Sequence, residues 1–375
     1  MPALPPAEGE IQPRLKHDAN VIKRILIGHC QRGNDCVALP HTMTDKKENM
    51  KNRICEILGV EKPVVQGPLN WLTNARYVAA VSNAGGLGVL GFNAGLKESV
   101  TTVGETVEAM RHEIRTVKAL TNRPFGINVA PSSDDPSQDR FTGPVLDLMA
   151  EENVSAAVMV GDLHPLWIAK FRERGITVVF RDGNPSANST RGAIEAGAQI
   201  IVATGFDEGG TLPVKAIGTF SIVPLVVDAA EGRAPVMAAG GIVDERTAKA
   251  AFALGAEGLY VGTAFMMAEE SPLADNIKRT AAATSADELV MYRTVPAWYR
   301  SLSGPLPDEL VRMSKAGATE EEIYKAQHAY IGMRDGMLFG DLSKGYASFG
   351  LGITQIRAIE PVQTVMDRLT GWMEA

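Results

Sequence analysis

The stretch PVMAAGGIVDERTAKAAFALGAEGLYVGTAFMMAEE, residues 235–270, decides the fold. It contains two short apolar runs, 235–241 and 258–263, and each has glycine near its end. Residues 245–254 between them have the apolar spacing of a helix. Continuous apolar runs predict strands that are buried on both faces, and a helix between two such strands predicts a parallel βα unit.

The same alternation extends back to the region just after residue 51. Six further apolar runs predict strands at 63–67, 85–91, 125–129, 156–160, 177–180 and 198–203. Helical patterns separate most of them, and the apolar run 223–227 is interpreted as part of a helix. Eight parallel βα units favour a closed α/β fold, the (β/α)8 TIM barrel, over an open doubly wound sheet.

The rest of the chain divides around this barrel, which we place at residues 51–267. Residues 268–345 have helical patterns near 274–284 and 319–328 and two proline-rich loops, so we expect an inserted helical lid subdomain. Residues 346–375 form a C-terminal segment that ends in an amphipathic helix. Its apolar stripe either packs back on the barrel or pairs two subunits in a homodimer.

Residues 1–50 are polar and aperiodic, and we interpret them as an irregular N-terminal extension. They lack the basic start, apolar stretch and small-residue cleavage site of a signal peptide. His29, Cys30 and Cys36 lie close together, but their spacing fits a tetrahedral zinc site poorly, so no metal is expected. Met43 and Met50 also allow a later start of the natural chain.

Composition excludes several classes of protein. The 375 residues include 37 Lys+Arg and 44 Asp+Glu, and a net charge of -7 argues against a nucleic-acid partner. No apolar run reaches the roughly 18 residues of a membrane span. Three cysteines are too few for a disulfide scaffold and favour a reducing, cytoplasmic location.

In a barrel of this class the active site lies at the carboxyl ends of the strands, and phosphate often binds after strands seven and eight. Gly240 and Gly241 follow the seventh predicted strand, and Gly262 and Thr263 follow the eighth. Glycine lets backbone N–H groups approach phosphate oxygens closely. The sequence therefore predicts a phosphate site here, although paired glycines also form plain turns.

Two polar residues stand out at other strand ends. Arg181 is interpreted as a contact to phosphate or to a flavin ring; the alternative is a surface ion pair with Asp182 or Glu195. Asn128 lies inside a strand, where asparagine is uncommon. It either binds a flavin edge or is a satisfied buried polar group.

With these residues the chain resembles the nitronate monooxygenases, a family related to FMN-dependent enoyl-(acyl carrier protein) reductases. The resemblance covers about residues 51–373 and is strongest over 235–270, with support from ICEILGVEKPVVQG, SNAGGLGVLG, FGINVA and GFDEGG. It implies noncovalently bound FMN on top of the barrel. The implied phosphate contacts are Gly209, Gly210, Gly240, Gly241, Gly262 and Thr263. The implied ring contacts are Gln66, Gly67, Pro68, Leu69, Asn128 and Arg181.

The chain departs from the family at the position of the catalytic residue. The family motif Gly-Phe-Glu-Ala-Gly-Gly-His ends in a catalytic histidine, whereas this chain has Thr211 there. A threonine hydroxyl can donate a hydrogen bond but cannot act as a base near neutral pH. His164, after the fourth strand, is the other histidine expected at the barrel mouth, and a loop histidine without a catalytic role is the alternative reading.

Three functions remain open from the sequence. The first is oxidation of alkyl nitronates, small anionic molecules, with O2 by FMN. The second is an NADH- or NADPH-dependent FMN reductase of an activated C=C bond or a quinone, in which Thr211 donates a hydrogen bond and Tyr299 or Tyr324 supplies a proton. The third is a non-catalytic flavin-binding subunit, to which only the missing histidine points.

Overall fold

The computed structural model describes residues 52–373. Its centre is a sheet of eight parallel strands, as expected for a (β/α)8 barrel. The strands are β1 (Val64–Gln66), β2 (Gly88–Leu90), β3 (Phe125–Val129), β4 (Ala156–Gly161), β5 (Thr177–Asp182), β6 (Ile200–Thr204), β8 (Val236–Ala239) and β9 (Gly258–Val261). His29, Cys30 and Cys36, which were considered as metal ligands from the sequence, lie outside the described residues.

The strand order is β1-β9-β8-β6-β5-β4-β3-β2, so β1 and β2 are the two edges that must meet. They meet through a parallel bridge between Val65 and Leu87. The Gln66 N–H donates to the Leu87 carbonyl over 3.0 Å, and the Val89 N–H donates to the Gln66 side-chain oxygen over 3.0 Å. The Gln66 side chain thus extends the ladder where the barrel closes.

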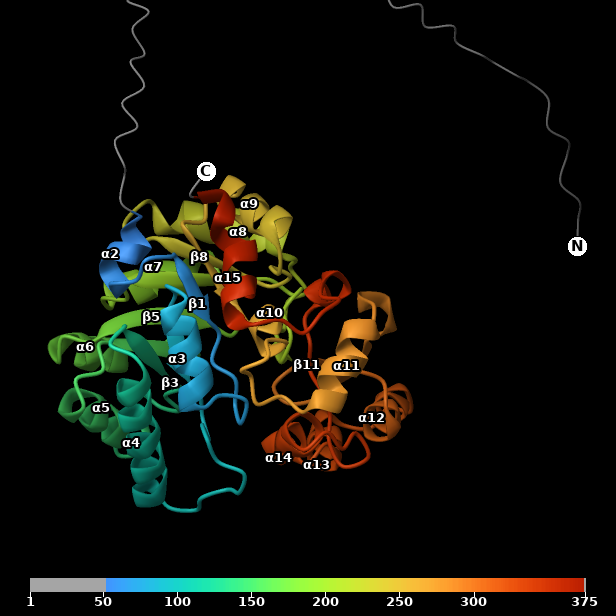
Figure 1. The fold of residues 1–375 in the computed structure, drawn as a ribbon. Helices are drawn as coiled ribbons and strands as arrows, with labels where there is room; N and C mark the ends of the chain where they lie inside the picture. Colours follow the sequence, from blue (N-terminus) through green and yellow to red (C-terminus); the bar gives the residue numbers. More distant parts are fainter. Residues whose placement is uncertain (1–51, 374–375) are drawn as a thin grey trace, which may run out of the picture. The chain divides into compact units, whose positions relative to one another are not determined.

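Helices cover the outside of the barrel (Figure 1). They are α3 (Ala75–Asn83), α4 (Val103–Leu120), α5 (Thr142–Glu151), α6 (Pro165–Glu173), α7 (Ala187–Glu195), α8 (Thr219–Ala230) and α9 (Glu245–Ala253). Helix α8 contains the run 223–227 that the sequence analysis assigned to a helix. Between helices and strands lies the large apolar core, with Trp167, Phe171 and Phe180 among its largest fully buried side chains.

A second apolar cluster fills the inside of the barrel. Val65, Val179 and Met237 from the strands contact Ile54 and Leu58 from the short helix α2 (Arg53–Leu58). Gly258 is the first residue of β9, and a Cβ added there would lie 2.8 Å from Ile54 Cδ1 of α2. Helix α2 therefore packs against the amino-terminal end of the strands and closes that end of the barrel. The carboxyl ends of the strands are left for the site.

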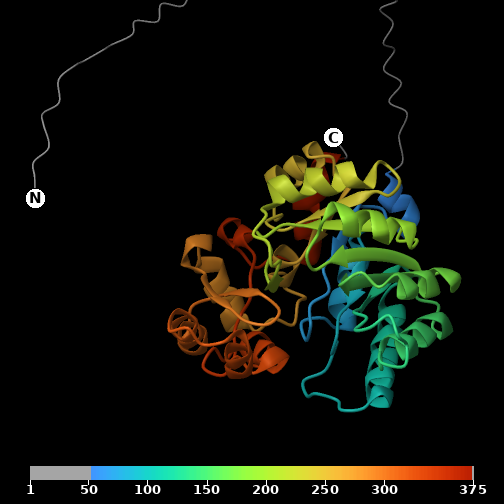
Figure 2. The same ribbon diagram turned by 180° about the vertical axis from the view of Figure 1, so that it is seen from behind.

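After β9 and the short helix α10 (Thr263–Met266), the chain leaves the barrel pattern. The following elements are α11 (Asp275–Ala283), η1 (Ala286–Glu288), β10 (Val290–Arg293), β11 (Trp298–Ser301), α12 (Pro305–Lys315), α13 (Glu320–Ala326), α14 (Ala329–Met333) and η2 (Arg334–Leu338). Their helices gather on one side of the barrel in both views (Figures 1 and 2). The predicted helical patterns coincide with α11 and α13, but the strands were not expected. They form an antiparallel sheet, β10-β11-β7, with β7 (Thr211–Leu212) from the loop after β6.

The chain ends with η3 (Leu351–Gln355), α15 (Val362–Thr370) and η4 (Gly371–Met373). Helix α15 packs against α3 and α9, and its apolar stripe, Val362, Val365, Met366 and Leu369, is buried in the main core. The stripe therefore faces the barrel rather than solvent. No helix within residues 52–373 is both long and apolar enough to cross a membrane.

Candidate active site

The glycines after β8 form a turn that only glycine accommodates well. Gly240 has φ 101° and Gly241 has φ 72°, in the left-handed region that disfavours other residues. A Cβ at Gly240 would lie 2.8 Å from the Thr219 hydroxyl oxygen and 2.9 Å from the Gly205 carbonyl oxygen. The backbone of β6, β8 and α8 is thus drawn together at this end of the barrel.

Gly262 and Thr263 follow the neighbouring strand β9. Ala239 pairs with Tyr260, so the two turns leave adjacent strands at the same edge. A Cβ at Gly262 would meet no heavy atom within 4 Å. Thr263 accepts a hydrogen bond from the Gly350 N–H over 3.0 Å, and its own hydroxyl hydrogen remains available to donate. Open space beside a glycine and a hydroxyl donor fits the phosphate of a cofactor.

Gly209 and Gly210 belong to a loop that is seated against the C-terminal segment. The Gly210 N–H donates to the Ser348 hydroxyl over 2.8 Å, and a Cβ at Gly209 would lie 2.6 Å from the Gly350 nitrogen. Ser348 in turn donates to the Arg300 carbonyl over 2.6 Å. These glycines therefore allow close packing between the β6 loop and residues 348–350.

The residues predicted around a flavin ring have defined places at the end of β1. Gln66 is fully buried, and both ends of its amide are engaged, one by the Val89 N–H and the other by the Gly67 carbonyl. Gly67 lies against the ring of Tyr260, where an added Cβ would come 3.0 Å from Cε1. Leu69 is half-buried and packs against the main core, and Pro68 precedes it.

Asn128 is buried in β3, and its amide nitrogen donates to two barrel carbonyls, Val158 at 3.1 Å and Val129 at 3.4 Å. These two bonds satisfy the amide nitrogen of Asn128, and the flavin contact predicted for this residue stays a prediction.

Arg181 forms a buried ion pair with Glu208, which follows β6. The side chains are only 13% and 11% exposed. The partner is neither Asp182 nor Glu195, the two carboxylates considered from the sequence. Burial raises the pKa of the Glu208 carboxyl to about 7, and Arg181 opposes that shift. Glu208 lies inside the GFDEGG motif but was not among the residues predicted for the site.

Thr211 pairs with Tyr299 across β7 and β11, and its hydroxyl donates to the Tyr299 hydroxyl over 2.8 Å. Burial raises the pKa of Tyr299, which keeps the phenol protonated at neutral pH. Tyr324, the other proposed proton donor, instead lies edge-on to Tyr330. Of the two tyrosines, Tyr299 is therefore the one joined to Thr211.

His164 is the residue just before α6, and its Nδ1 lies 3.5 Å from a carboxylate oxygen of Asp134. Thr211 contacts Tyr299 instead, so the structure does not bring the two predicted catalytic residues together through a hydrogen bond. His164 belongs to a contact between the β3 and β4 loops.

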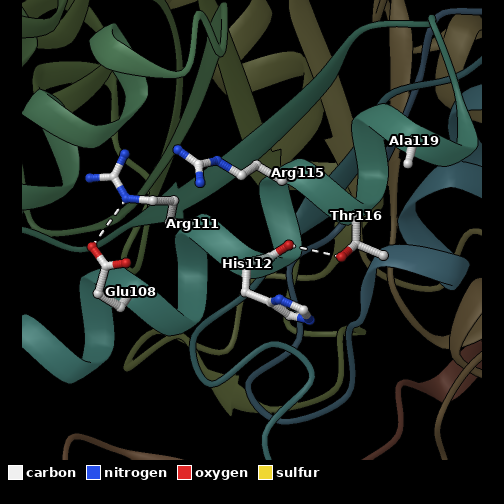
Figure 3. Close-up of a pocket in the computed structure, with 6 residues that line it drawn as sticks. All are labelled: Glu108, Arg111, His112, Arg115, Thr116 and Ala119. Carbon is white, nitrogen blue, oxygen red and sulfur yellow. Dashed lines mark hydrogen bonds and ion pairs between the residues drawn. The ribbon is translucent and has the colours of Figure 1, made fainter.

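Two hollows in the described surface have different relations to this site. One, of about 440 Å³, lies between α8, α9 and η3 and is bordered by Asp207, Thr219, Gly240 and Gly241. The other, of about 480 Å³, lies on the outer face of α4 (Figure 3). There Arg111 pairs with Glu108, Glu151 and Glu152, and Arg115 pairs with Glu152. The first hollow touches the glycine turn; the second is a surface network of charges.

The fold and strand-end site define a (β/α)8-barrel enzyme with a glycine-lined mouth. The chain belongs to the nitronate monooxygenase family, whose model matches residues 51–371. It is 33% identical over 270 residues to "(3aS,4S,5R,7aS)-5-hydroxy-7a-methyl-1-oxo-octahydro-1H-indene-4-carboxyl-CoA dehydrogenase" of Mycobacterium tuberculosis, covering 71% of this chain and 70% of that protein. It is 32% identical over 260 residues to the nitronate monooxygenase of Pseudomonas aeruginosa, covering 59% and 71%.

The solved structure of FabK from Thermotoga maritima is also similar, with a TM-score of 0.74 and 26% identity over 86% of this chain and 96% of FabK. These relatives support the barrel assignment and the resemblance drawn from the sequence. The matched proteins are named as monooxygenases and dehydrogenases, so the chain is an oxidoreductase.

Proposed function

We propose that this chain is an FMN-dependent oxidoreductase that oxidises alkyl nitronates with O2. The observation that carries the proposal is the open space at Gly262, beside the Thr263 hydroxyl and the left-handed turn Gly240-Gly241. Backbone N–H groups at such turns favour anions, as the phosphate of FMN requires.

Bound FMN supplies the electron-transfer chemistry, and the protein residues hold and orient the reactants. Gly240, Gly241, Gly262 and Thr263 hold the phosphate in this proposal. Thr211 is a hydrogen-bond donor fixed by Tyr299 and does not act as a base. A nitronate is already an anion, so its oxidation requires no base.

A second candidate is supported by the relative named as a carboxyl-CoA dehydrogenase, at 33% identity. In this alternative an activated acyl thioester is the substrate, NADH or NADPH or their oxidised forms are the co-substrates, and bound FMN would supply the hydride-transfer chemistry. Such a substrate also requires a donor toward its carbonyl oxygen. The Thr211 hydroxyl performs this role only when its one hydrogen turns from Tyr299 to the substrate.

One experiment separates the two. FMN-loaded protein is mixed with NADH or NADPH under argon, and separately with propyl nitronate in air. We expect little bleaching of the flavin by either nucleotide and rapid O2 consumption with propyl nitronate. Fast bleaching without nitronate-dependent O2 consumption would contradict the nitronate proposal and favour the acyl-thioester alternative.

A further inference from the structure

The two oxygens of the Glu208 carboxylate, at the barrel mouth, differ in their hydrogen bonding. Oε2 pairs with Arg181. Oε1 is buried and has no hydrogen-bond partner among residues 52–373. Leaving a buried acceptor unsatisfied destabilises the folded state, so such an atom calls for an explanation.

The adjacent carboxylate has a different role. Asp207 accepts hydrogen bonds from the Thr219 N–H at 2.6 Å and the Thr219 hydroxyl at 2.9 Å, at the start of α8. Asp207 therefore fixes the β6 loop to α8. Glu208 makes no comparable structural contact with its second oxygen.

The charged and titratable groups around Glu208 come from three elements. Arg181 of β5 pairs with its carboxylate, and the Tyr260 phenol of β9 interacts electrostatically with both members of the pair. Arg300 of β11 donates to the backbone carbonyls of Glu208 at 2.5 Å and Phe206 at 3.1 Å. Arg300 thus fixes the loop backbone and leaves Oε1 free. Because burial favours the neutral acid while Arg181 favours the anion, both protonation states are accessible near neutral pH.

We propose that Glu208 is the general acid–base of this enzyme, with Arg181 as its positioning partner. The substrate class is a carbon acid, whose C–H bond lies next to a nitro group or a thioester carbonyl. The C–H bond breaks, its electron pair stays on the substrate as a nitronate or enolate, and the proton forms an O–H bond at Glu208 Oε1. This inference rests on the proposed function and extends it from nitronates to their neutral parent compounds.

The first test compares neutral 1-nitropropane with propyl nitronate on FMN-loaded protein. Glu208→Gln should lower the ratio of kcat/KM for 1-nitropropane to kcat/KM for propyl nitronate about 10²–10⁴-fold, since only the neutral compound must lose a proton. Glu257→Gln, which alters a different Arg–Glu pair with Arg53, should leave that ratio unchanged. Equal rates for wild type and Glu208→Gln on 1-nitropropane, or no turnover of 1-nitropropane by wild type, would overturn the inference.

The second test requires no turnover. Infrared difference spectra of the FMN-loaded protein should show a carboxylic-acid carbonyl band that titrates near pH 7, persists in Glu257→Gln and disappears in Glu208→Gln. Arg181→Gln should move its midpoint upward by about one pH unit or more, because a neighbouring cation lowers a carboxyl pKa. A wild-type spectrum without such a band would overturn the inference even if nitronate oxidation is observed. Conversely, a protein that shows the band but does not oxidise nitronates would contradict the proposed substrate and leave the protonation of Glu208 supported.

Discussion

The hydroxyl of Thr211 lies 2.8 Å from the hydroxyl of Tyr299 and donates a hydrogen bond to it. This bond joins the β6 loop of the barrel to the sheet β10-β11-β7. Tyr299 also packs edge-on against Tyr346 and parallel to Tyr292, so the barrel loop is tied to the small aromatic core of residues 268–346.

A double-mutant cycle measures this bond. Thr211→Val and Tyr299→Phe each remove one partner while keeping the shape of the side chain. Each single change should lower the free energy of unfolding by about 1 kcal/mol, and the double change should cost little more than one of them. Urea unfolding of the four proteins provides the values. Strictly additive effects would mean that the two hydroxyls do not interact.

Gly262→Ala tests where the phosphate binds. Gly262 has φ -100°, and a Cβ there meets no protein atom, so the free energy of unfolding should change by less than about 0.5 kcal/mol. If the phosphate lies against Gly262, the methyl group should weaken FMN binding at least tenfold and affect riboflavin, which lacks phosphate, much less. Gly371→Ala, also open but at the far end of the chain, is the matched control. Fluorescence titration of each variant with FMN and with riboflavin measures the affinities. An unchanged FMN affinity of Gly262→Ala would show that the phosphate does not lie against Gly262.

Gln66→Leu tests the seam of the barrel. The change leaves the buried Val89 N–H without its partner. We expect a loss of about 1–3 kcal/mol in the free energy of unfolding, measured by urea denaturation. Gln363→Leu, on the exposed surface of α15, should cost much less. A Gln66→Leu protein as stable as wild type would show that the side chain does not help to close the barrel.

The raised pKa of Glu208 predicts how stability depends on pH. Between about pH 4.5 and pH 7 the folded state binds more protons at this carboxyl than the unfolded state does. The free energy of unfolding of wild type should therefore fall, relative to Glu208→Gln, as the pH rises through this window. The total change is on the order of 3 kcal/mol for a shift of this size. Parallel curves for the two proteins, measured by denaturant unfolding from pH 4.5 to 8, would be inconsistent with a raised pKa.

The barrel could be predicted because each of its strands is a continuous apolar run followed by a helical pattern. The sheet β10-β11-β7 could not, since β7 has two residues and its partner Trp298–Ser301 is nearly ninety positions away. Glu208 was missed for a related reason. Its chemistry depends on Arg181, which lies 27 positions earlier and on a different strand. The available signal was a carboxylate beside the glycines of one strand end and a cation at the end of the preceding strand.

Gln66 shows what a sequence pattern leaves open. The family resemblance implies a flavin contact there, which stays a prediction, while the structure shows that both ends of the amide bond to the backbone of the barrel. A sequence pattern places a side chain at the mouth but does not reveal which hydrogen bonds the neighbouring strand already supplies.

The most direct test of the central claim is a titration of the purified full-length protein with FMN, followed by absorbance and flavin fluorescence. We predict one FMN bound per chain, with riboflavin bound much more weakly because it lacks the phosphate that the turns at Gly240-Gly241 and Gly262-Thr263 are proposed to hold. Protein that carries no flavin and takes up none from a saturating FMN solution would contradict the account.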